Sequence, residues 1–290
     1  MFGPNTTGSF FYNLSYSHRD KEFKSIFEKL RLQFQIKFNL YDYDLLFIAG
    51  SGTIGIESVI SSCNRHVNLL GASGKFKDRW SQLSRKYEPK ESSNSIDMFC
   101  QLETSCSKTF YKTNSIINAI SSFPYYELPE DTPIFITCPN KQLGAFPGVS
   151  IVAVRKDSWS LIRESEEFSY LNLFLHKKYS ENSQTLTTAP TPVFEHLLHC
   201  IENLDVVELR NKIDLASELV VNAVGAENII GQHKCPVITF KKDSIRDTIA
   251  EKYELYGVNN SSSDYYQVFT YSHPIRDYEK FAMELIHEGN

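Results

Sequence analysis

The hydrophobic and polar positions along the first two thirds of the chain follow two alternating periods. Residues 20–34 carry apolar side chains at mostly helical spacing, which predicts an amphipathic helix. Residues 44–49 form a short apolar run that ends in Gly50, which is typical of a buried strand. The same patterns predict helices over 53–62 and 76–87 and strands over 66–70, 98–102, 115–119, 133–137 and 149–154. Strands and helices that alternate in this way indicate an α/β domain with a mainly parallel sheet.

The pattern changes after about Val193, where it becomes helical. Residues 204–224 are apolar along one face and long enough to link two domains. A compact α+β unit is predicted beyond them, with strands over 237–240 and 265–271 and helices over 244–256 and 275–288. We therefore expect a large domain over 1–205 and a small C-terminal domain over 206–290, with 1–19 as a segment that could pack on the small domain.

Composition narrows the classes of function. The 290 residues are 41% hydrophobic with a formal charge of −5, and Lys and Arg are spread along the chain. Nothing therefore indicates a nucleic-acid-binding surface. The first residues lack a basic segment followed by an apolar run, and no stretch approaches the roughly 20 apolar residues of a membrane span. We expect a cytoplasmic protein without a nucleic-acid or membrane partner.

Cysteine and histidine give no sign of a metal site. The six cysteines include no C-x-x-C pair, so we expect reduced and mostly buried thiols. His196 and His199 lie three residues apart in a helical segment, but no third ligand of suitable spacing accompanies them. We expect no metal.

Two local motifs carry candidate chemistry, and the first is Gly50-Ser51-Gly52-Thr53 between a predicted strand and a predicted helix. A helix N-terminus presents backbone N–H groups and a partial positive charge, and glycines let an anion approach the backbone. The motif could therefore cradle a phosphate. It has neither the Walker pattern nor the G-x-G-x-x-G pattern, and an ordinary strand–helix turn fits it equally well.

The second motif is Asn140-Lys141, which follows the predicted strand 133–137. A lysine just past the carboxyl end of a buried strand points toward the mouth of the sheet, where α/β enzymes bind ligands. Partial desolvation there lowers the pKa of the amine and makes it nucleophilic, as Schiff-base formation requires. A single loop lysine is more often simply solvated, so this motif decides little by itself.

In their order along the chain, these motifs resemble the class V aminotransferases, which are pyridoxal 5′-phosphate (PLP) enzymes of fold type I. The likeness extends from about residue 2 to 200 and is closest to the 2-aminoethylphosphonate–pyruvate transaminases. It rests on Gly50-Ser51-Gly52-Thr53 with Glu57, on Asn140-Lys141 with Pro147-Gly148, on Gly3-Pro4-Asn5-Thr6-Thr7 and on Thr188-Ala189-Pro190-Thr191-Pro192. The resemblance implies an α/β PLP-dependent transferase with a small α+β C-terminal domain.

The resemblance also implies a role for each matching residue. Lys141 would form the Schiff base with PLP and later move the substrate's proton. The cofactor phosphate would be bound by Ser51, Gly52 and Thr53, and the ring by Phe76, Thr104 and Asn118. For Phe76, a place in the core is an equally good interpretation. Thr191 would reach the cofactor of a neighbouring subunit, which implies a homodimer, and Thr6 and Gln267 fall at substrate positions.

The chain departs from the family pattern at two chemical positions. Asn118 stands where the family has an Asp that keeps the pyridine nitrogen protonated, and a neutral amide cannot do so electrostatically. Gln267 stands where the family has an Arg that grips a substrate carboxylate, and Arg246 or Arg276 could serve instead. The chain is also short between Glu103 and Asn118, where a helix is expected to be missing.

Three functions remain open on these observations. The first is an aminotransferase for a small amine or amino acid and a 2-oxo acid. The second is another PLP reaction, a decarboxylation or an elimination on an atypical amino compound, which the loss of the Asp and the Arg favours modestly. The third is a non-catalytic relative of the fold, against which the retention of both Lys141 and the phosphate motif argues.

Overall fold

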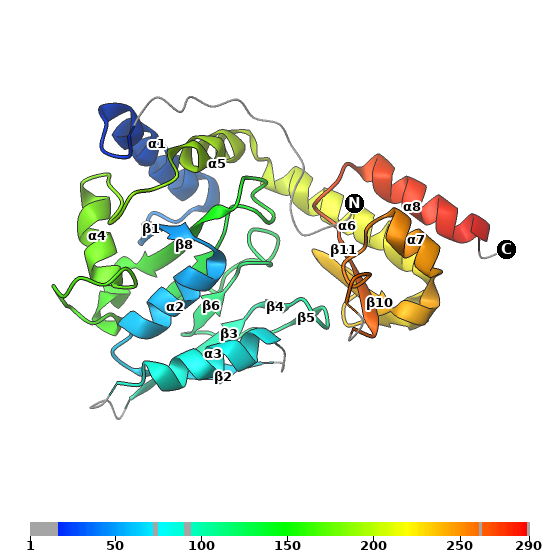
Figure 1. The fold of residues 1–290 in the computed structure, drawn as a ribbon, viewed down its shortest axis with the longest axis horizontal. Helices are drawn as coiled ribbons and strands as arrows, with labels where there is room; N and C mark the ends of the chain where they lie inside the picture. The colour runs from blue at the N-terminus through cyan, green and yellow to red at the C-terminus, as the bar shows by residue number, and fades with distance from the viewer. Residues whose placement is uncertain (1–16, 72–74, 90–93, 261–262, 289–290) are drawn as a thin grey trace.

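A six-stranded sheet forms the centre of the larger part of the molecule in the computed structural model (Figure 1), which describes residues 17–71, 75–89, 94–260 and 263–288. The strand order is β1-β8-β7-β6-β3-β2. The strands are β1 (Tyr43–Gly50), β2 (His66–Leu70), β3 (Ser95–Cys100), β6 (Ile116–Asn118), β7 (Ile134–Thr137) and β8 (Gly148–Arg155). Neighbours from β2 to β7 pair in parallel, whereas β8 is antiparallel to both β7 and β1. The predicted α/β class with a mainly parallel sheet is confirmed.

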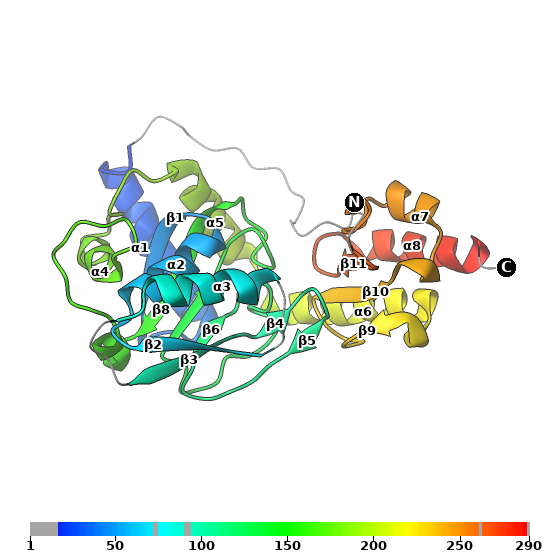
Figure 2. The ribbon, with the colours of Figure 1, turned by 60° about the horizontal axis from the view of Figure 1, so that its bottom comes forward.

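Helices cover both faces of this sheet (Figures 1 and 2). They are α1 (Lys21–Phe38), α2 (Gly52–Ser62), α3 (Lys75–Lys86), α4 (Leu173–Glu181) and α5 (Thr191–Asn203). The buried side chains of α1 and α5 share one hydrophobic cluster, and those of α2, α3 and α4 share the cluster on the opposite face. Both faces of the sheet are therefore buried, as parallel sheets require.

Aromatic packing fixes α1 and α5 against each other and against the sheet. The Phe194 ring of α5 lies 5.0 Å from that of Phe23 and 5.8 Å from that of Phe47, measured between centroids, in edge-on arrangements. Such pairs contribute roughly 0.5–1.5 kcal/mol each beyond the burial of their area. Because Phe194 is fully buried, replacing it by alanine should destabilise the fold by roughly 3–5 kcal/mol.

A third hydrophobic cluster lies in the C-terminal part of the chain, at the right of Figure 1. A three-stranded antiparallel sheet of order β11-β10-β9 packs there with three helices. The elements are α6 (Val206–Val224), β9 (Ile229–Ile230), β10 (Val237–Lys241), α7 (Asp247–Lys252), β11 (Tyr265–Phe269) and α8 (Ile275–Glu288). We call this part the C-terminal unit. The domain division predicted near residue 205 falls in the link between α5 and α6 and stays a prediction.

The helices α7 and α4 differ from the sequence-based expectation. The helix predicted over 244–256 is shorter, because the chain turns at Glu254 with a left-handed φ of 46° and Tyr256 then bridges to Gln267 of β11. The helix α4 was not predicted. Its nine residues are fixed by the Asn172 side chain, which accepts hydrogen bonds from the backbone N–H groups of Phe174 and Leu175.

A hairpin occupies the short stretch between Glu103 and Asn118. Its strands β4 (Leu102–Glu103) and β5 (Lys108–Thr109) reach from the large sheet to the C-terminal unit (Figure 2). At its tip, Ser107 is fully buried, and its hydroxyl donates to the carbonyl of Val237 at 2.6 Å. Gly231 passes so close to this tip that an added Cβ would overlap the carbonyl oxygen of Cys106. The hairpin therefore joins the two parts of the molecule.

Candidate active site

Three predicted site residues lie at one edge of the large sheet because of its topology. The strands β1, β6 and β7 run in the same direction, so their carboxyl ends meet at that edge. Asn118 is the last residue of β6, Lys141 lies in the turn after β7, and Ser51 is the N-cap of the helix that follows β1. This edge is where open α/β sheets bind their ligands.

The N-terminus of α2 contacts the loops that follow β6 and β7. A Cβ added to Gly52 would lie 2.5 Å from the Cδ1 atom of Ile120 and 3.7 Å from the Cβ atom of Cys138. A larger residue at position 52 would therefore push the helix end away from both loops. Ser51 is exposed and Thr53 is half-buried, so this helix end is open to an anion.

The turn that carries Lys141 is fastened to the loop after β6. The next residue, Gln142, is buried, and its amide nitrogen donates to the carbonyl of Ser121 at 2.7 Å. Its amide oxygen accepts from the backbone N–H of Tyr125 at 3.0 Å. These two bonds hold Lys141 beside the end of β6. Gln142 was not predicted as a site residue, because only its place next to the lysine marks it in the sequence.

The Lys141 amine is partly desolvated. Burial lowers its pKa, and the neighbouring Cys138 opposes this shift. The Nζ atom lies 5.7 Å from the ring centroid of Phe269, which belongs to β11 of the C-terminal unit. A lysine amine with a lowered pKa is neutral for a larger fraction of the time near pH 7, which is what a nucleophilic amine needs.

A cavity beside these loops collects four of the predicted cofactor-binding residues. Thr53, Phe76, Thr104 and Asn118 all line it, although they come from four different elements or connections. The rest of the described lining is Ile56, Trp80, Cys100, Leu102, Ile120 and Ser121, none of which is charged. The structure therefore brings together residues that lie up to 65 positions apart in the sequence.

Phe76 has the exposure of a binding residue rather than of a core residue. Its side chain is 46% exposed, whereas Trp80, one turn further along α3, is 3% exposed and belongs to the core. The two ring centroids lie 6.1 Å apart. An exposed aromatic ring at the mouth of a cavity can pack on the face of a flat ligand.

Thr104 and Gln267 meet at the joint between the hairpin and the C-terminal unit. Gln267 is 2% exposed, and its amide nitrogen donates to the carbonyl oxygen of Thr104 and to the hydroxyl of Thr239. The Thr239 hydroxyl also donates to the Thr104 carbonyl at 3.1 Å. Both hydrogens of the Gln267 amide are thus engaged within the protein, and the predicted substrate contact through Gln267 stays a prediction.

The remaining predicted residues are less directly placed. Thr191 is the buried first residue of α5, and its neighbours Pro190 and Val193 pack near Gly148, away from the described lining of the cavity. Thr6 lies outside the described residues. Arg276, proposed as a substitute for the missing Arg, is largely exposed beside Asp277.

Across the described ranges, no group of three or more His, Cys, Asp or Glu side chains is placed to hold a metal ion. His196 is buried, and its Nδ1 atom accepts from the backbone N–H of Phe146 at 3.1 Å. No helix in the part of the chain that the structure describes is long and apolar enough to cross a membrane.

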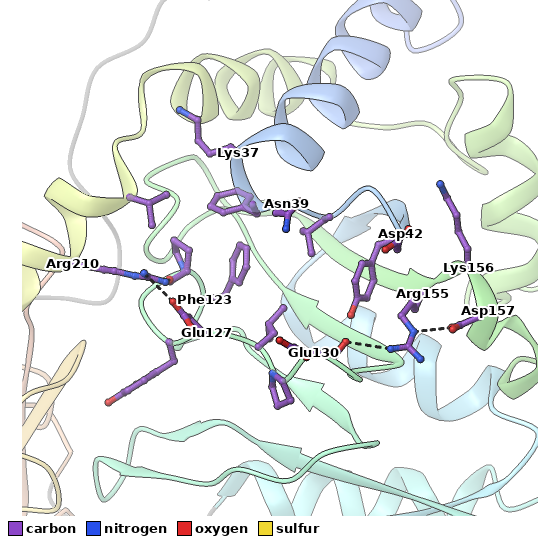
Figure 3. A pocket seen from close by; sticks show the side chains of 18 residues that line it. Lys37, Asn39, Asp42, Phe123, Glu127, Glu130, Arg155, Lys156, Asp157 and Arg210 are labelled. Carbon is purple, nitrogen blue, oxygen red and sulfur yellow. Dashed lines mark hydrogen bonds and ion pairs between the residues drawn. The ribbon is translucent and has the colours of Figure 1, made fainter.

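A larger groove lies elsewhere, where β1 begins and β8 ends (Figure 3). We call it the charged groove, because Lys37, Asp42, Glu127, Glu130, Arg155, Lys156, Asp157 and Arg210 line it. Several of these charges are already paired: Arg155 with Asp157 at 2.7 Å, and Arg210 with Glu127 at 3.4 Å. No predicted site residue within the described chain lies in this groove.

Comparison with solved structures identifies the fold. The chain has the fold of the PLP-dependent aminotransferases. It is similar to an aspartate aminotransferase of subgroup IV from Thermus thermophilus, with a TM-score of 0.79 over 95% of this chain and 94% of the other, at 16% identity. It is also similar to a phosphoserine aminotransferase from Cytophaga hutchinsonii, with a TM-score of 0.77 over 95% of this chain and 91% of the other, at 13% identity.

Comparison of the sequence leads to the same class. An uncharacterized aminotransferase from Helicobacter pylori is 25% identical over 82% of this chain and 77% of its own length. No model of a known protein family matches the chain. Sequence relatives and structural neighbours are thus aminotransferases alike, and the structural neighbours include a PLP-bound phosphoserine aminotransferase from Trichomonas vaginalis.

The residues at the site fit PLP. The cofactor combines an anionic phosphate, a flat heteroaromatic ring and an aldehyde, and these need an anion site, an apolar face and a nucleophilic amine. The α2 N-terminus, the exposed ring of Phe76 and the partly desolvated Lys141 supply these three features.

Proposed function

We propose that this protein is a PLP-dependent aminotransferase that binds its cofactor covalently through Lys141. The observation that carries the proposal is the convergence of Thr53, Phe76, Thr104 and Asn118 on one cavity, beside the loop that holds a desolvated lysine. The aminotransferase relatives and the shared fold support it independently.

Each part of the site then has a separate task. When bound, PLP withdraws electrons from the amine-bearing carbon of the substrate. The N-terminus of α2, with Ser51, Gly52 and Thr53, binds the phosphate. Phe76 and Thr104, which line the cavity, would hold the ring, Phe76 by packing on its face and Thr104 through its hydroxyl. Lys141, with its pKa lowered by burial, would hold the cofactor and would accept the proton from the amine-bearing carbon of the substrate.

The finer parts of the proposal concern substrate and assembly. We infer a small amine or amino acid as donor and a 2-oxo acid as acceptor, with 2-aminoethylphosphonate as a donor to test because of the sequence likeness described above. We also infer a homodimer in which Thr191 reaches the cofactor of the neighbouring subunit, and a cytoplasmic location. Thr191 is the buried first residue of α5, so packing fixes the position from which it would reach that cofactor.

Transfer of labelled nitrogen tests the activity directly. The purified protein is loaded with PLP and incubated with ¹⁵N-labelled amines, 2-aminoethylphosphonate and alanine among them, together with unlabelled pyruvate or glyoxylate. We expect ¹⁵N in the amino acid formed from the 2-oxo acid, in step with an oxo product from the donor. No labelled product with any pair would contradict the proposal.

The hydrogen bonds of the Gln267 amide favour a second candidate function. Because its amide is engaged with Thr104 and Thr239, the usual carboxylate grip is absent from this position, and a substrate carboxylate would be held less firmly. This observation favours a decarboxylase or a lyase. Release of carbon dioxide or of a leaving group from the donor, without nitrogen transfer, would identify that function.

A further inference from the structure

Asn118 lines the cavity that Thr53, Phe76 and Thr104 share, which we call the cofactor cavity. We propose that the Asn118 amide donates a hydrogen bond to the pyridine nitrogen of PLP and so keeps that nitrogen unprotonated. This inference rests on the proposed function, because it assumes that PLP binds in the cavity. It goes further by specifying the charge state in which this chain holds the cofactor, which controls how strongly the ring withdraws electrons.

Two contacts fix the orientation of the Asn118 amide, and they agree. The Oδ1 atom accepts a hydrogen bond from the backbone N–H of Ile120 at 3.1 Å. The Nδ2 atom lies 3.4 Å from the Sγ atom of Cys100, on the neighbouring strand β3. A backbone N–H can only donate, so the oxygen must face Ile120, and the nitrogen is left to face Cys100.

The thiol of Cys100 can only accept from this amide. Its single hydrogen is donated to the carbonyl of Leu102 at 3.1 Å. The bonds therefore run in one direction, from the Asn118 N–H through the Cys100 thiol to the Leu102 carbonyl. Burial raises the pKa of the Cys100 thiol well above its ordinary value, so the chain of bonds is neutral throughout. One N–H of the Asn118 amide then remains as a donor.

No carboxylate among the described lining residues can hold a proton on a ring nitrogen placed beside Asn118. None of the described lining residues is charged. The carboxylate of Glu103 adds to burial in raising the pKa of the Cys100 thiol, but it does not line the cavity, and it accepts hydrogen bonds from the backbone N–H and the hydroxyl of Ser105. Desolvation disfavours a cationic ring unless an anion compensates it. A neutral pyridine nitrogen, by contrast, is an acceptor that matches the remaining N–H donor.

An unprotonated pyridine nitrogen beside Asn118 affects how well the cofactor stabilises negative charge on the substrate. An unprotonated ring withdraws less charge than a protonated one, so the protein would stabilise negative charge at the amine-bearing carbon less strongly. Asn118→Asp would place an anion at the same position and restore the proton.

The test is the ¹⁵N NMR frequency of the ring nitrogen in PLP-loaded protein, with PLP labelled at that nitrogen. We expect the wild type to show the frequency of an unprotonated pyridine near pH 7 and Asn118→Asp to show that of a pyridinium. Asn114→Asp is the matched control, because it adds a carboxylate at an exposed position just before the same strand, and it should leave the frequency unchanged.

The outcomes separate this inference from the proposed function. Bound label with a pyridinium frequency in the wild type would overturn the inference while leaving the aminotransferase proposal intact. Absence of bound label altogether would overturn both. If Asn118→Asp does not fold, the wild-type frequency decides alone, because only an unprotonated nitrogen agrees with the inference.

Discussion

The cofactor cavity and the charged groove differ in the charge of their linings and in whether those charges are already paired within the protein. In the groove, Arg155 pairs with Asp157 and Arg210 pairs with Glu127 (Figure 3). The Lys156 amine donates to the carbonyl of Tyr41. The cavity is smaller and uncharged, but its lining comes from helix starts and strand ends that meet at one edge of the sheet. The size of a cavity is therefore a weaker indication of a functional site than the convergence of separate elements on it.

The largest expected effect is the difference in activity between replacing Lys141, beside the cofactor cavity, and replacing Lys156, in the charged groove. Lys141→Ala should lower aminotransferase activity by about 10³-fold or more, because it removes both the covalent anchor and the proton carrier. Lys156→Ala, in the charged groove, should leave activity within about twofold, because an exposed residue there has no part in the chemistry. Initial rates of nitrogen transfer measure both. Equal losses of activity in the two variants would contradict the assignment of the chemistry to the cofactor cavity.

The next effect concerns the joint that holds Thr104 in the wall of the cavity. Gly231→Ala should destabilise the protein by about 2–4 kcal/mol, since φ is +89° there and the new Cβ would meet the carbonyl of Cys106. Gly71→Ala is the matched control: φ is +92°, but the nearest atom lies 3.7 Å away, so only about 1 kcal/mol of backbone strain is expected. Urea denaturation compares the two. Similar losses would show that the close approach at Gly231 is unimportant.

A smaller effect tests the aromatic side of the cavity. Phe76→Ala should weaken PLP binding about tenfold, which corresponds to the loss of roughly 1.4 kcal/mol of ring contact. It should change the free energy of unfolding by less than about 0.5 kcal/mol, because the side chain is 46% exposed. Phe168→Ala, at a position that is 70% exposed and away from the cavity, is the control for binding titrations. Unchanged affinity in Phe76→Ala would remove Phe76 from the site.

The smallest effect is a dependence of stability on pH. Burial lowers the pKa of Lys141 below its ordinary value of 10.5. Between the lowered folded value and the ordinary unfolded value, the unfolded chain binds more protons, so the Lys141 contribution to stability rises with pH. Cofactor-free Lys141→Met should therefore be more stable than the wild type at neutral pH, and the difference should shrink as the pH approaches 10.5. Denaturation at several pH values measures it, and a difference that is constant with pH would contradict the assignment.

Much of the large sheet could be predicted from sequence because its strands are short apolar runs with clear ends. The residues 66–70 and 133–137 fall on β2 and β7 almost without shift. The hairpin could not be predicted in the same way, since its strands have two residues each and are held by the buried Ser107 and by the closely packed Gly231. Long-range contacts of this kind leave no local period in the sequence.

The residue types at the candidate site could be predicted from the sequence better than the contacts between them. Asn118 could be recognised as neutral from sequence, but the direction of its amide depends on Cys100 and on the backbone of Ile120. Gln267 was predicted at a substrate position, and its engagement with the Thr104 carbonyl became visible only in three dimensions. Side-chain partners 18 or 163 positions apart cannot be inferred from spacing along one chain.

The central claim is that Lys141 is the residue that binds PLP, and borohydride trapping tests it most directly. Reduction of the PLP-loaded protein should fix the cofactor irreversibly, and peptide mass spectrometry should find the added mass on Lys141. Lys141→Ala should show neither the visible absorbance band of the lysine–PLP Schiff base nor the trapped peptide. An unchanged band in Lys141→Ala, or the added mass on another lysine, would contradict the account.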